Sequence, residues 1–435
     1  MSKIKKINLC IAGLGTVGSN VVKILSENHK IFLEKDNIDF NIVGVSAKNK
    51  FKKRIINIDK FKWFSDPIKM IHESNYDILI ELIGEEKGIS FELIKQTLEN
   101  NKNVVTANKA LLAKNGSQLF KIAEKNNVQL LFEAAVAGGI PIVKVIKQSL
   151  HLNNIIKISG ILNGTTNYIL SEMENKNSNF SETLKDAQIK GFAESNPTND
   201  IEGVDSAHKL SLLTTISFGA TINFNKISYK GISDIHIDDI KNAKKLGYKI
   251  KLISESQLMN NQVSTVVEPR LIKFENYLSS VNGVLNAIKI KSNFLNPLIL
   301  EGEGAGGKPT ASSIISDLYE ISLYPYSNSL GFSTDKLFDY QYMDASNSLC
   351  SYYLRIIVKD ISGVLAKITS NLNEVGISIE TILQIPENKF NEGIPIIIVT
   401  HETKKNLLKK ALDKIEKLEF VLSNITTIAI DKSIE

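Results

Sequence analysis

Short apolar runs alternate with longer amphipathic stretches along the first third of the chain. The apolar runs have the length of buried strands and occupy residues 6–12, 40–45, 77–83, 103–107 and 128–134. Several of the stretches between them repeat apolar residues at helical spacing. Strands that alternate with helices in this way predict a doubly wound parallel sheet, with helices on both of its faces.

The alternation ends near residue 137, and the pattern then predicts two further domains. Residues 203–218 have the spacing of a helix, and a second helix is expected at residues 310–319. After an irregular stretch, residues 351–431 follow the order strand, helix, strand, strand, helix, strand. We therefore expect an α/β chain with five parts: a Rossmann-type domain at 1–136, an α+β domain at 137–305, a returning helix at 306–323, a linker at 324–349 and a βαββαβ domain at 350–435.

The composition supports a soluble globular protein and excludes several classes. Of the 435 residues, 43% are apolar and 23% are charged, and no apolar run reaches the length of a membrane span. The net charge of +5 comes from lysines spread over the whole sequence, so no dense basic block indicates nucleic-acid binding. Cys10 and Cys350 are too few for a disulfide framework, and no His/Cys cluster has the spacing of a zinc site. We expect a cytoplasmic protein.

A glycine-rich turn joins the first expected strand to the helix after it. The turn reads Gly13-Leu-Gly15-Thr16-Val17-Gly18. In a dinucleotide-binding fold the first glycine makes the tight turn, the second lets the pyrophosphate approach the backbone, and the third lets helix and strand pack closely. The pyrophosphate then lies at a helix N-terminus, which favours anions. The motif therefore predicts a dinucleotide site, and a glycine turn in an unrelated α/β protein is the alternative.

The end of the second expected strand carries cations where an NAD site usually has an acidic residue. Lys50, Lys52, Lys53 and Arg54 follow this strand closely. A carboxylate at this place binds the ribose 2′-hydroxyl of NAD, whereas cations suit the 2′-phosphate of NADP. The sequence therefore favours NADP over NAD, although such a loop is also typical of a solvated surface.

Three charged residues in the middle of the chain are candidates for proton transfer. Asp205 and Lys209 are four apart on the expected helix at 203–218, which runs on into apolar packing. A partly buried lysine beside an aspartate can exchange a proton with an alcohol while hydride leaves its carbon. Lys109 follows an expected strand at the carboxyl edge of the sheet, where ligands bind. The alternatives are a solvated salt bridge for the pair and a surface lysine for Lys109.

Three loops are informative, and two of them leave more than one interpretation open. Glu133 interrupts an apolar stretch just before a glycine turn. It is either a structural hydrogen-bond acceptor, which the residues slightly favour, or part of a loop whose carbonyls hold a small cation. The polar turn at 162–168 has Asn and Thr groups that would bind the ends of a substrate or merely cap the next helix. A glycine-rich loop at 301–310 opens the returning helix and suits a close approach to the cofactor.

Taken in order, six motifs make the chain similar to homoserine dehydrogenases over roughly the first 320 residues. They are GLGTVG, VVTANKALLA, FEAAVAGGIPIVK, ILNGTTNYIL, GFAESNPTNDIEGVDSAHKL and EGEGAGGKPTA. The resemblance implies NAD(P)-dependent interconversion of L-homoserine and L-aspartate 4-semialdehyde, on the route to threonine and methionine. It implies that Lys209 donates the proton in the reducing direction and that Asp205 helps to hold the substrate and a bridging water. Glu194 would bind the substrate's amino group, and Lys109 would be a second functional lysine at the reaction centre.

The same resemblance extends to the cofactor and to a cation. Gly191 and Gly306 would contact the cofactor, together with Lys109 and the turn at 13–18. The loop after residue 132 is similar to the family's monovalent-cation site, for Na⁺ or K⁺. The ligands of that site correspond to the backbone oxygens of Glu133, Val136, Gly138 and Ile140. The resemblance thereby favours the cation over a merely structural Glu133. The chain departs from the family at Gly84-Glu85, where two glycines are frequent on the nicotinamide side.

The C-terminal unit resembles an ACT domain, which binds small amino acids at a paired interface. Asp360 and Gly363 lie in the loop between its first strand and helix, which is the ligand-binding loop by this resemblance. The expected effector is the end product L-threonine, and a module that only dimerises is the alternative. We expect a monofunctional, feedback-regulated enzyme in a homodimer or homotetramer. The competing hypothesis is an amino-acid sensor on an inactive dehydrogenase scaffold. The presence of Lys109, Glu194, Asp205 and Lys209 disfavours this hypothesis.

Overall fold

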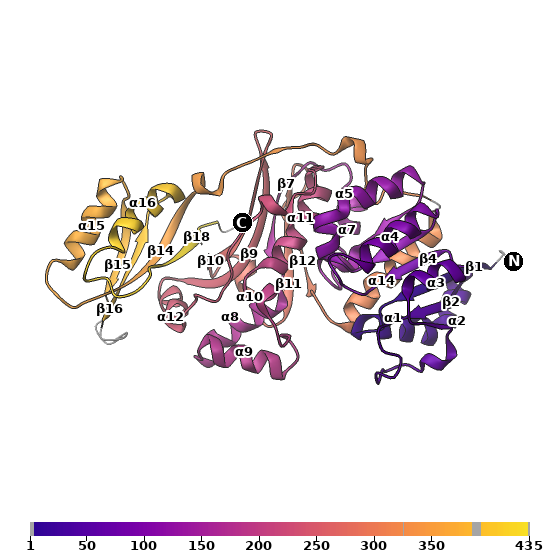
Figure 1. The fold of residues 1–435 in the computed structure, drawn as a ribbon. Helices are drawn as coiled ribbons and strands as arrows, with labels where there is room; N and C mark the ends of the chain where they lie inside the picture. The colour runs from indigo at the N-terminus through magenta and orange to yellow at the C-terminus, as the bar shows by residue number, and fades with distance from the viewer. Residues whose placement is uncertain (1–3, 325, 385–392, 434–435) are drawn as a thin grey trace.

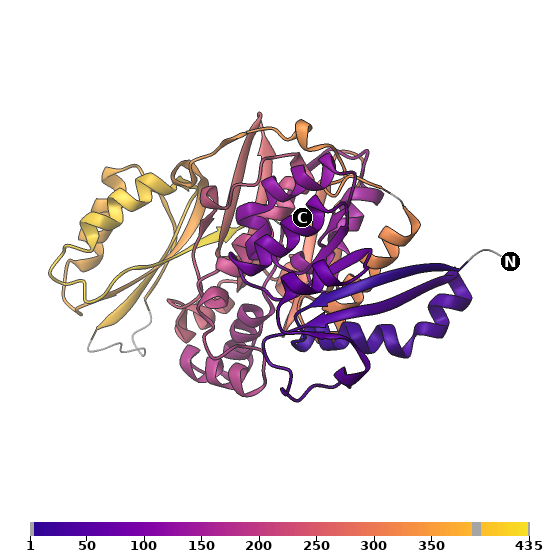
Figure 2. The ribbon, with the colours of Figure 1, turned by 45° about the vertical axis from the view of Figure 1, so that its right-hand side comes forward.

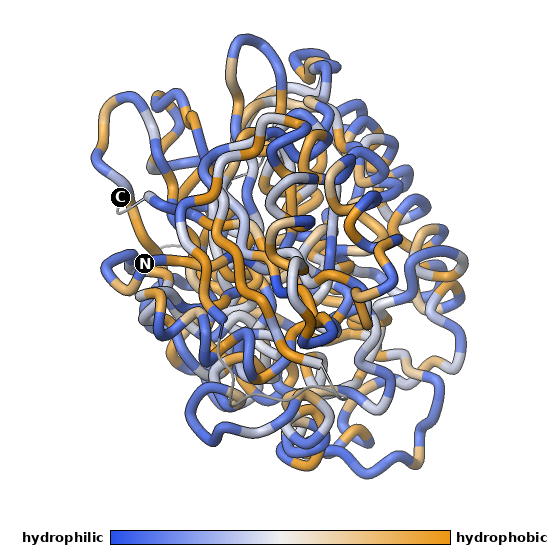
Figure 3. Tube along the Cα trace, turned by 90° about the vertical axis from the view of Figure 1, so that its left-hand side faces the viewer, coloured by the Kyte–Doolittle hydropathy of each residue, from blue (hydrophilic) through white to orange (hydrophobic). Residues whose placement is uncertain are grey.

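The structure is a computed structural model that describes residues 4–324, 326–384 and 393–433. Its three domains lie in a row, as Figure 1 shows: a parallel sheet with its helices at one end, a mixed sheet in the middle and the C-terminal domain at the other end. Loops and outward helix turns are mostly hydrophilic, whereas many strands carry long hydrophobic stretches (Figure 3). Within the described residues, no helix is both long and apolar enough to cross a membrane.

The first domain contains a six-stranded parallel sheet, which confirms the predicted doubly wound fold. The strands lie in the order β3-β2-β1-β4-β5-β6, so the winding reverses between β1 and β4. The strands are β1 (Lys5–Ala12), β2 (Ile38–Ser46), β3 (Trp63–Phe64), β4 (Ile78–Glu81), β5 (Asn103–Thr106) and β6 (Leu130–Leu131). The helices are α1 (Thr16–Glu27), α2 (His29–Asp36), α3 (Pro67–Glu73), α4 (Ile89–Glu99) and α5 (Lys109–Lys125), with a 3-10 turn η1 (Ile58–Lys60).

The strand predicted at 128–134 is wrong over most of its length. Only residues 130–131 form a strand, β6, which pairs with β5, and a short helix α6 (Glu133–Val136) begins soon afterwards. The Glu133 carboxylate accepts hydrogen bonds of 2.8 Å from the backbone N–H groups of Val143 and Lys144. The apolar run thus continues into buried helical turns, which an apolar pattern alone cannot distinguish from a strand.

The middle domain is built on a mixed sheet whose strands run in the order β12-β11-β7-β9-β10. Its strands are β7 (Ile155–Ile161), β8 (Ser228–Tyr229), β9 (Tyr248–Met259), β10 (Gln262–Lys273), β11 (Leu285–Ser292) and β12 (Leu298–Glu303). Its helical segments are α7 (Ile142–Lys144), the π-helical turn η2 (Val145–Ser149), α8 (Gly164–Lys176), α9 (Phe180–Ile189), α10 (Thr198–Ile201), α11 (Val204–Phe218), η3 (Phe224–Lys226), α12 (Ile237–Lys245) and α13 (Tyr277–Ser280). Helix α11 confirms the helix predicted at 203–218, and it contacts α5, β7 and β9. It therefore lies at the boundary between the two domains.

Helix α14 (Gly307–Leu323) leaves the middle domain and returns to the first one, as Figure 1 shows. It packs against α1, and Ile314 and Leu318 are buried in the same apolar core as strand β1. A Cβ on Gly307 would lie 2.4 Å from the amide nitrogen of Asn20. The two helices therefore approach too closely at this point for a larger residue. The helix extends beyond the predicted helical range of 310–319 at both ends and lies within the range of 306–323 expected for the returning helix.

The segment expected to be a linker, 324–349, is anchored to the domains that it passes. It contains the 3-10 turns η4 (Thr334–Lys336) and η5 (Ala345–Asn347), and the strand β13 (Gln341–Tyr342), which pairs with β10. Ser329 accepts a hydrogen bond of 2.9 Å from the N–H of Leu130 in β6. The described part of this segment therefore follows the surface of both preceding domains.

The C-terminal domain has the predicted βαββαβ order with one added short strand, β17. Its elements are β14 (Leu349–Val358), α15 (Val364–Glu374), β15 (Ile379–Gln384), β16 (Ile394–Thr400), β17 (Thr403–Lys404), α16 (Lys405–Ile415) and β18 (Thr426–Asp431). Both helices lie on the same side of its sheet (Figure 2). Strand β18 pairs antiparallel with β14 and parallel with β10, where Ala429 lies opposite Arg270. The sheets of the middle and C-terminal domains are therefore continuous.

Candidate active site

Two cavities open at the carboxyl ends of the first domain's strands, where ligands bind in folds of this topology. The first, of about 530 Å³, is lined by the glycine turn after β1, the loop after β2 and the residues that follow β4. The second, of about 540 Å³, lies between the first and middle domains. Leu82 and Ile83 line the first cavity and Gly84 lines the second. The two cavities therefore adjoin.

The glycine turn has the geometry that a dinucleotide site requires. Gly13 has φ +103°, and a Cβ there would lie 2.4 Å from the carbonyl oxygen of Leu82. A Cβ on Gly18 would lie 2.0 Å from the carbonyl oxygen of Gly13. Helix and strand therefore pack too closely here for any residue larger than glycine. Gly15 faces open space and lines the first cavity, while residues 16–17 form the first turn of α1. The N-terminus of α1 is therefore open to a phosphate group.

The cations after β2 contribute to the first cavity in different ways. Lys48, Lys52 and Arg54 all line it. The Arg54 guanidinium also donates hydrogen bonds to four backbone carbonyls, one of them that of Leu14 in the glycine turn, at 3.1 Å. Arg54 therefore holds the loop against the glycine turn, a role that the sequence did not reveal.

Asp205 lies between the two candidate lysines in the wall of the second cavity. Its carboxylate oxygens lie 3.0 Å from Nζ of Lys109 and 2.7 Å from Nζ of Lys209, and Asn163 donates a hydrogen bond of 3.0 Å to it. Burial alone would raise the pKa of Asp205, but the two ammonium groups outweigh burial and hold that pKa well below its usual range. The Asp205 charge in turn raises the pKa of Lys109. We call Lys109, Asp205 and Lys209 the Asp205 cluster.

The two lysines of the Asp205 cluster differ in their access to the cavity. The side chain of Lys109 is 39% exposed and lines the cavity. The side chain of Lys209 is only 8% exposed, and its Nζ also donates a hydrogen bond of 2.7 Å to the carbonyl of Leu162. A ligand in the cavity therefore meets Lys109 and Asp205 first, with Lys209 directly beside Asp205.

The other predicted substrate and cofactor residues lie in different places. Glu194 is exposed and lines the second cavity from the loop before α10. Gly191, in the same loop, has φ +76° and lines neither cavity. Gly306 has φ +127° and immediately precedes α14, outside the lining of both cavities. The structure thus brings Glu194 to the Asp205 cluster but not the two glycines.

Asn163 connects the polar turn before α8 to the acidic residues of the site. Its Oδ1 accepts a hydrogen bond of 2.8 Å from the N–H of Thr166, and its Nδ2 donates to Asp200 at 2.7 Å as well as to Asp205. Asn167 donates to two backbone carbonyls of the middle domain. The turn therefore caps α8 and also positions Asp205. Asp200 lines the second cavity, and sequence reasoning missed it although it stands in the same motif as Asp205.

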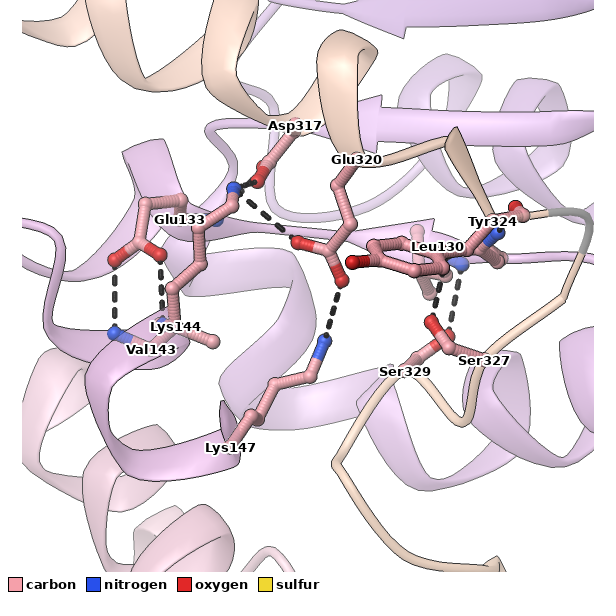
Figure 4. Close-up of polar contacts among 11 residues, drawn as sticks. Leu130, Glu133, Val143, Lys144, Lys147, Asp317, Glu320, Tyr324, Ser327 and Ser329 are labelled. Carbon is pink, nitrogen blue, oxygen red and sulfur yellow. Dashed lines mark hydrogen bonds and ion pairs between the residues drawn. The ribbon is translucent and has the colours of Figure 1, made fainter. Parts of the chain in front are cut away.

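A second group of buried charges lies where α14 passes the segment of α7 and η2, as Figure 4 shows. Lys144 pairs with Asp317 and lies 3.3 Å from Glu320, and Lys147 lies 3.4 Å from Glu320. These four side chains are 3–16% exposed. Burial and then the Asp317 charge raise the pKa of the neighbouring Glu133 to about 7, and burial also raises the pKa of Asp317. We call these five residues the Asp317 cluster.

Helix α14 also holds the loop that was expected to bind a cation. Ser313 donates a hydrogen bond of 2.6 Å to the carbonyl of Gly138, and Asp317 accepts one of 3.0 Å from the N–H of Glu133. The four residues whose carbonyls would bind the ion are all buried: Glu133, Val136, Gly138 and Ile140. Carbonyl oxygens are hard ligands, and those of Gly138 and Ile140, which each accept one hydrogen bond, keep a second lone pair. The loop therefore fits the chemistry of a monovalent cation. Among the described residues, no group of three or more His, Cys, Asp or Glu side chains is arranged to hold a metal.

The expected effector residues lie in the loop between β14 and α15 of the C-terminal domain. Asp360 is exposed, and Gly363 has φ +87° at the residue before α15. A Cβ on Gly363 would have open space around it. The positive φ, and not crowding, therefore favours glycine here.

Three family models match the chain. The model described as homoserine dehydrogenase matches residues 141–319, and the one described as homoserine dehydrogenase, NAD binding domain, matches residues 13–133. The model of the ACT domain matches residues 352–420.

Relatives of known name cover nearly the whole chain. The homoserine dehydrogenases of Neisseria gonorrhoeae and Helicobacter pylori are 36% and 38% identical to it, each over 98% of this chain and 99% of their own. A crystal structure of the Thiobacillus denitrificans enzyme is 35% identical, covers 99% of both chains and has a TM-score of 0.89. A hyperthermophilic archaeal homoserine dehydrogenase mutant in complex with NADPH is 26% identical over 74% of this chain and 99% of its own, with a TM-score of 0.64. The chain therefore belongs to the homoserine dehydrogenase family and carries a C-terminal ACT domain.

Proposed function

We propose that this chain interconverts L-homoserine and L-aspartate 4-semialdehyde with NADP as its preferred cofactor. The observation that carries the proposal is the Asp205 cluster, in which one carboxylate lies between two lysines in the wall of a cavity. This cavity adjoins the one that the glycine turn lines, so the substrate and the nicotinamide would meet near Gly84. Such an arrangement suits the transfer of a proton together with a hydride.

The residues of the Asp205 cluster have distinct roles in the proposed reaction. A nicotinamide held at the glycine turn would supply hydride transfer to and from C4 of the substrate. In the reducing direction, Lys209 gives a proton to the carbonyl oxygen as it becomes an alcohol. Lys109, which lines the cavity, stabilises the negative charge that develops on that oxygen. Asp205 stays ionised between the two amines and holds them in place, and Glu194 binds the substrate's ammonium group.

The preference for NADP and the need for a monovalent cation are the finer parts of the proposal. Lys48, Lys52 and Arg54 line the first cavity, where their charges would attract a ribose 2′-phosphate. The archaeal relative in complex with NADPH supports the same cofactor. The carbonyl-lined loop at 133–140 would hold Na⁺ or K⁺ and so keep its position beside α14.

The ACT domain supports feedback control by an amino acid. We propose L-threonine as the effector, bound at the loop of Asp360 and Gly363, and a cytoplasmic homodimer or homotetramer in which ACT domains pair. An amino-acid sensor on an inactive scaffold is the weaker alternative, because Lys109, Asp205 and Lys209 are all present and in contact.

Absorbance at 340 nm, which reports NADPH and NADH, tests the proposal with purified protein, L-homoserine and NADP or NAD in turn. We expect reduction of the cofactor only when homoserine is present, a higher rate with NADP, and inhibition by L-threonine. A flat trace with both cofactors, from folded protein supplied with K⁺, would overturn the proposed activity. A lack of inhibition by threonine would assign the ACT domain to dimerisation or to another amino acid.

A further inference from the structure

Glu81 is a buried carboxylate that the proposed mechanism does not use. It is the last residue of β4, beside the point where the winding of the parallel sheet reverses. Its exposed fraction is 0%, and no lysine, arginine or histidine pairs with it in the part of the chain that the structure describes. Burial raises the pKa of Glu81, and hydrogen bonds, first that from Thr106, oppose the rise. A carboxylate in such a place is costly unless hydrogen bonds compensate it, so its partners are informative.

One oxygen of Glu81 holds the loop that follows β4. Oε1 accepts hydrogen bonds of 2.9 Å from the N–H of Ile83 and 3.3 Å from that of Gly84. Ile83 lines the first cavity and Gly84 lines the second, so this loop lies where the two cavities adjoin. Two N–H groups that share one acceptor fix the direction in which the chain leaves β4. Glu81 therefore sets the position of the loop between the two cavities.

The other oxygen of Glu81 reaches the neighbouring strand. Thr106 ends β5 and lies opposite Glu81 in the parallel pair of β4 and β5, and its exposed fraction is also 0%. Its hydroxyl donates a hydrogen bond of 2.7 Å to Oε2 of Glu81 and accepts one of 3.0 Å from the N–H of Asn108. A hydroxyl can do both at once, because it has one donor and two acceptor lone pairs. The carboxylate is thus connected through Thr106 to the start of α5.

Asn108 completes the connection to Lys109. Its Oδ1 accepts a hydrogen bond of 3.2 Å from a backbone N–H in the first turn of α5, and its Nδ2 donates one of 2.8 Å to the carbonyl of Glu85 in the loop after β4. Lys109 is the next residue and the first of α5, and its Nζ lies 3.0 Å from Asp205. The start of α5 is therefore tied to β4 and its loop at two points, the Thr106 hydroxyl and the Asn108 amide.

We propose that Glu81 and Thr106 are positioning residues for the hydride transfer. They hold Lys109 at a fixed place relative to the loop after β4, beside which the nicotinamide and the substrate would meet. Neither residue touches a ligand, because both side chains are fully buried. The inference rests on the proposed function and deepens it. Such positioning matters because reacting atoms must approach to about 3–3.5 Å, and a displacement of about 1 Å can cost about 100-fold in rate.

Thr106→Val tests the connection with a small change of shape. It removes the hydroxyl and leaves both N–H contacts of Glu81 in place, so the start of α5 loses one of its two ties. We expect kcat for homoserine oxidation to fall by about 10–100-fold. The KM for homoserine and the KM for NADP should stay nearly unchanged, because the hydroxyl binds neither reactant. Thr106→Ser keeps the hydroxyl and should restore kcat. Initial rates at 340 nm, with each reactant varied in turn, separate these constants.

Thr97→Val is the matched control for the loss of a buried hydroxyl. Thr97 lies on α4 of the same domain, is 0% exposed and lines neither cavity. Its hydroxyl donates a hydrogen bond of 2.8 Å to the carbonyl of Leu93. The two threonine-to-valine variants should lower the urea midpoint of unfolding by similar amounts, whereas only Thr106→Val should lower kcat.

Glu81→Gln tests the same connection from its other end and does not depend on the folding of Thr106→Val. Glutamine keeps the shape and an acceptor oxygen for the loop after β4. Its amide group would donate to the Thr106 hydroxyl, whose own proton then loses its acceptor. The fall in kcat should match that of Thr106→Val. The double variant should fall no further than the more severe single variant, because the two residues act through one connection.

Several results would overturn the inference while leaving the proposed function intact. They are an unchanged kcat or a rise confined to KM in Thr106→Val, an equal fall of kcat in Thr97→Val, no recovery in Thr106→Ser, and losses that multiply in the double variant. A wild-type protein that oxidises no homoserine would refute the proposed function itself, and this inference with it.

Discussion

The Asp205 cluster and the Asp317 cluster contain the same kinds of side chain in different surroundings. In both, a carboxylate that is nearly inaccessible to solvent pairs with lysine. The Asp205 cluster borders a cavity of about 540 Å³, whereas the Asp317 cluster lies between α14 and the segment of α7 and η2 (Figure 4). Two lysines share one carboxylate in the first cluster, and three carboxylates share two lysines in the second.

This difference in charge balance has opposite effects on the two aspartates. The pKa of Asp205 is lowered because its two ammonium neighbours outweigh burial, whereas burial raises the pKa of Asp317 in spite of Lys144. The first cluster keeps a permanent charge beside a ligand site, and the second joins helices of two domains. A buried lysine–aspartate pair is therefore a candidate for catalysis when it borders a cavity and for stability when it is enclosed.

Removal of the Lys209 amine should have the largest effect on the first cluster. Lys209→Ala deletes the proposed proton donor and leaves Asp205 paired with Lys109 alone. We expect turnover to fall by about 10²–10⁴-fold, the usual contribution of a positioned acid or base. Homoserine-dependent absorbance at 340 nm measures turnover, and a fluorescence titration should show NADPH binding unchanged. Near-normal turnover would remove Lys209 from the mechanism.

Asp317→Asn should affect stability and leave turnover nearly unchanged. It removes one of the two carboxylates beside buried Lys144, which keeps Glu320 at 3.3 Å, so the free energy of unfolding should fall by about 1.5–3 kcal/mol, the contribution of a hydrogen bond to a charged group. Urea unfolding measures this loss. Glu27→Gln, which breaks an exposed pair with Lys23 at 3.8 Å, is the control and should cost less than about 1 kcal/mol. Lost turnover at unchanged stability would place Asp317 in the mechanism and erase the contrast between the clusters.

Glu194→Gln should weaken the binding of substrate without affecting that of the cofactor. The variant loses a charged partner for the substrate's ammonium group, so the KM for homoserine should rise by about 10–100-fold. The KM for NADP should stay unchanged, since Glu194 lines only the second cavity. Initial-rate measurements with each reactant varied in turn separate the two constants. An equal rise in both would mean that Glu194 supports the shape of the site and does not bind the substrate.

Acid should also destabilise the protein through His208, a residue of α11 whose pKa is lowered chiefly by burial. The pKa of His208 is about 4 in the folded chain and 6.5 ordinarily, so the unfolded chain takes up the proton first as pH falls. The contribution of neutral His208 to the free energy of unfolding is complete above pH 6.5. It is lost as pH falls from 6.5 to about 4, at up to about 1.4 kcal/mol per pH unit. Denaturant unfolding across this range should show a shallower slope in His208→Phe than in the wild type. Identical slopes would contradict the assigned charge state.

Local patterns were sufficient for the parallel sheet and for the spacing of Asp205 and Lys209, because periodicity reports which face of an element is buried. They were insufficient wherever residues far apart in the chain meet. Lys109 reaches Asp205 from another domain, and Asp317 reaches Glu133 from the returning helix. Arg54 also illustrates this limit, because the sequence counts its charge but does not reveal which carbonyls it binds. The catalytic, cation and effector roles of these residues stay predictions until they are tested.

Strand β18 pairs both with β14 and with β10, so the C-terminal ACT domain is not a removable attachment. A chain cut before β14 would leave residues 270–272 of β10 without their partner strand. An open strand edge is a template for aggregation, so such a truncation would reduce solubility. Single substitutions in the loop at 360–363 leave the joined sheet intact. Point mutations in this loop, and not truncations, are therefore the changes that would test the proposed effector site without disturbing the rest of the fold.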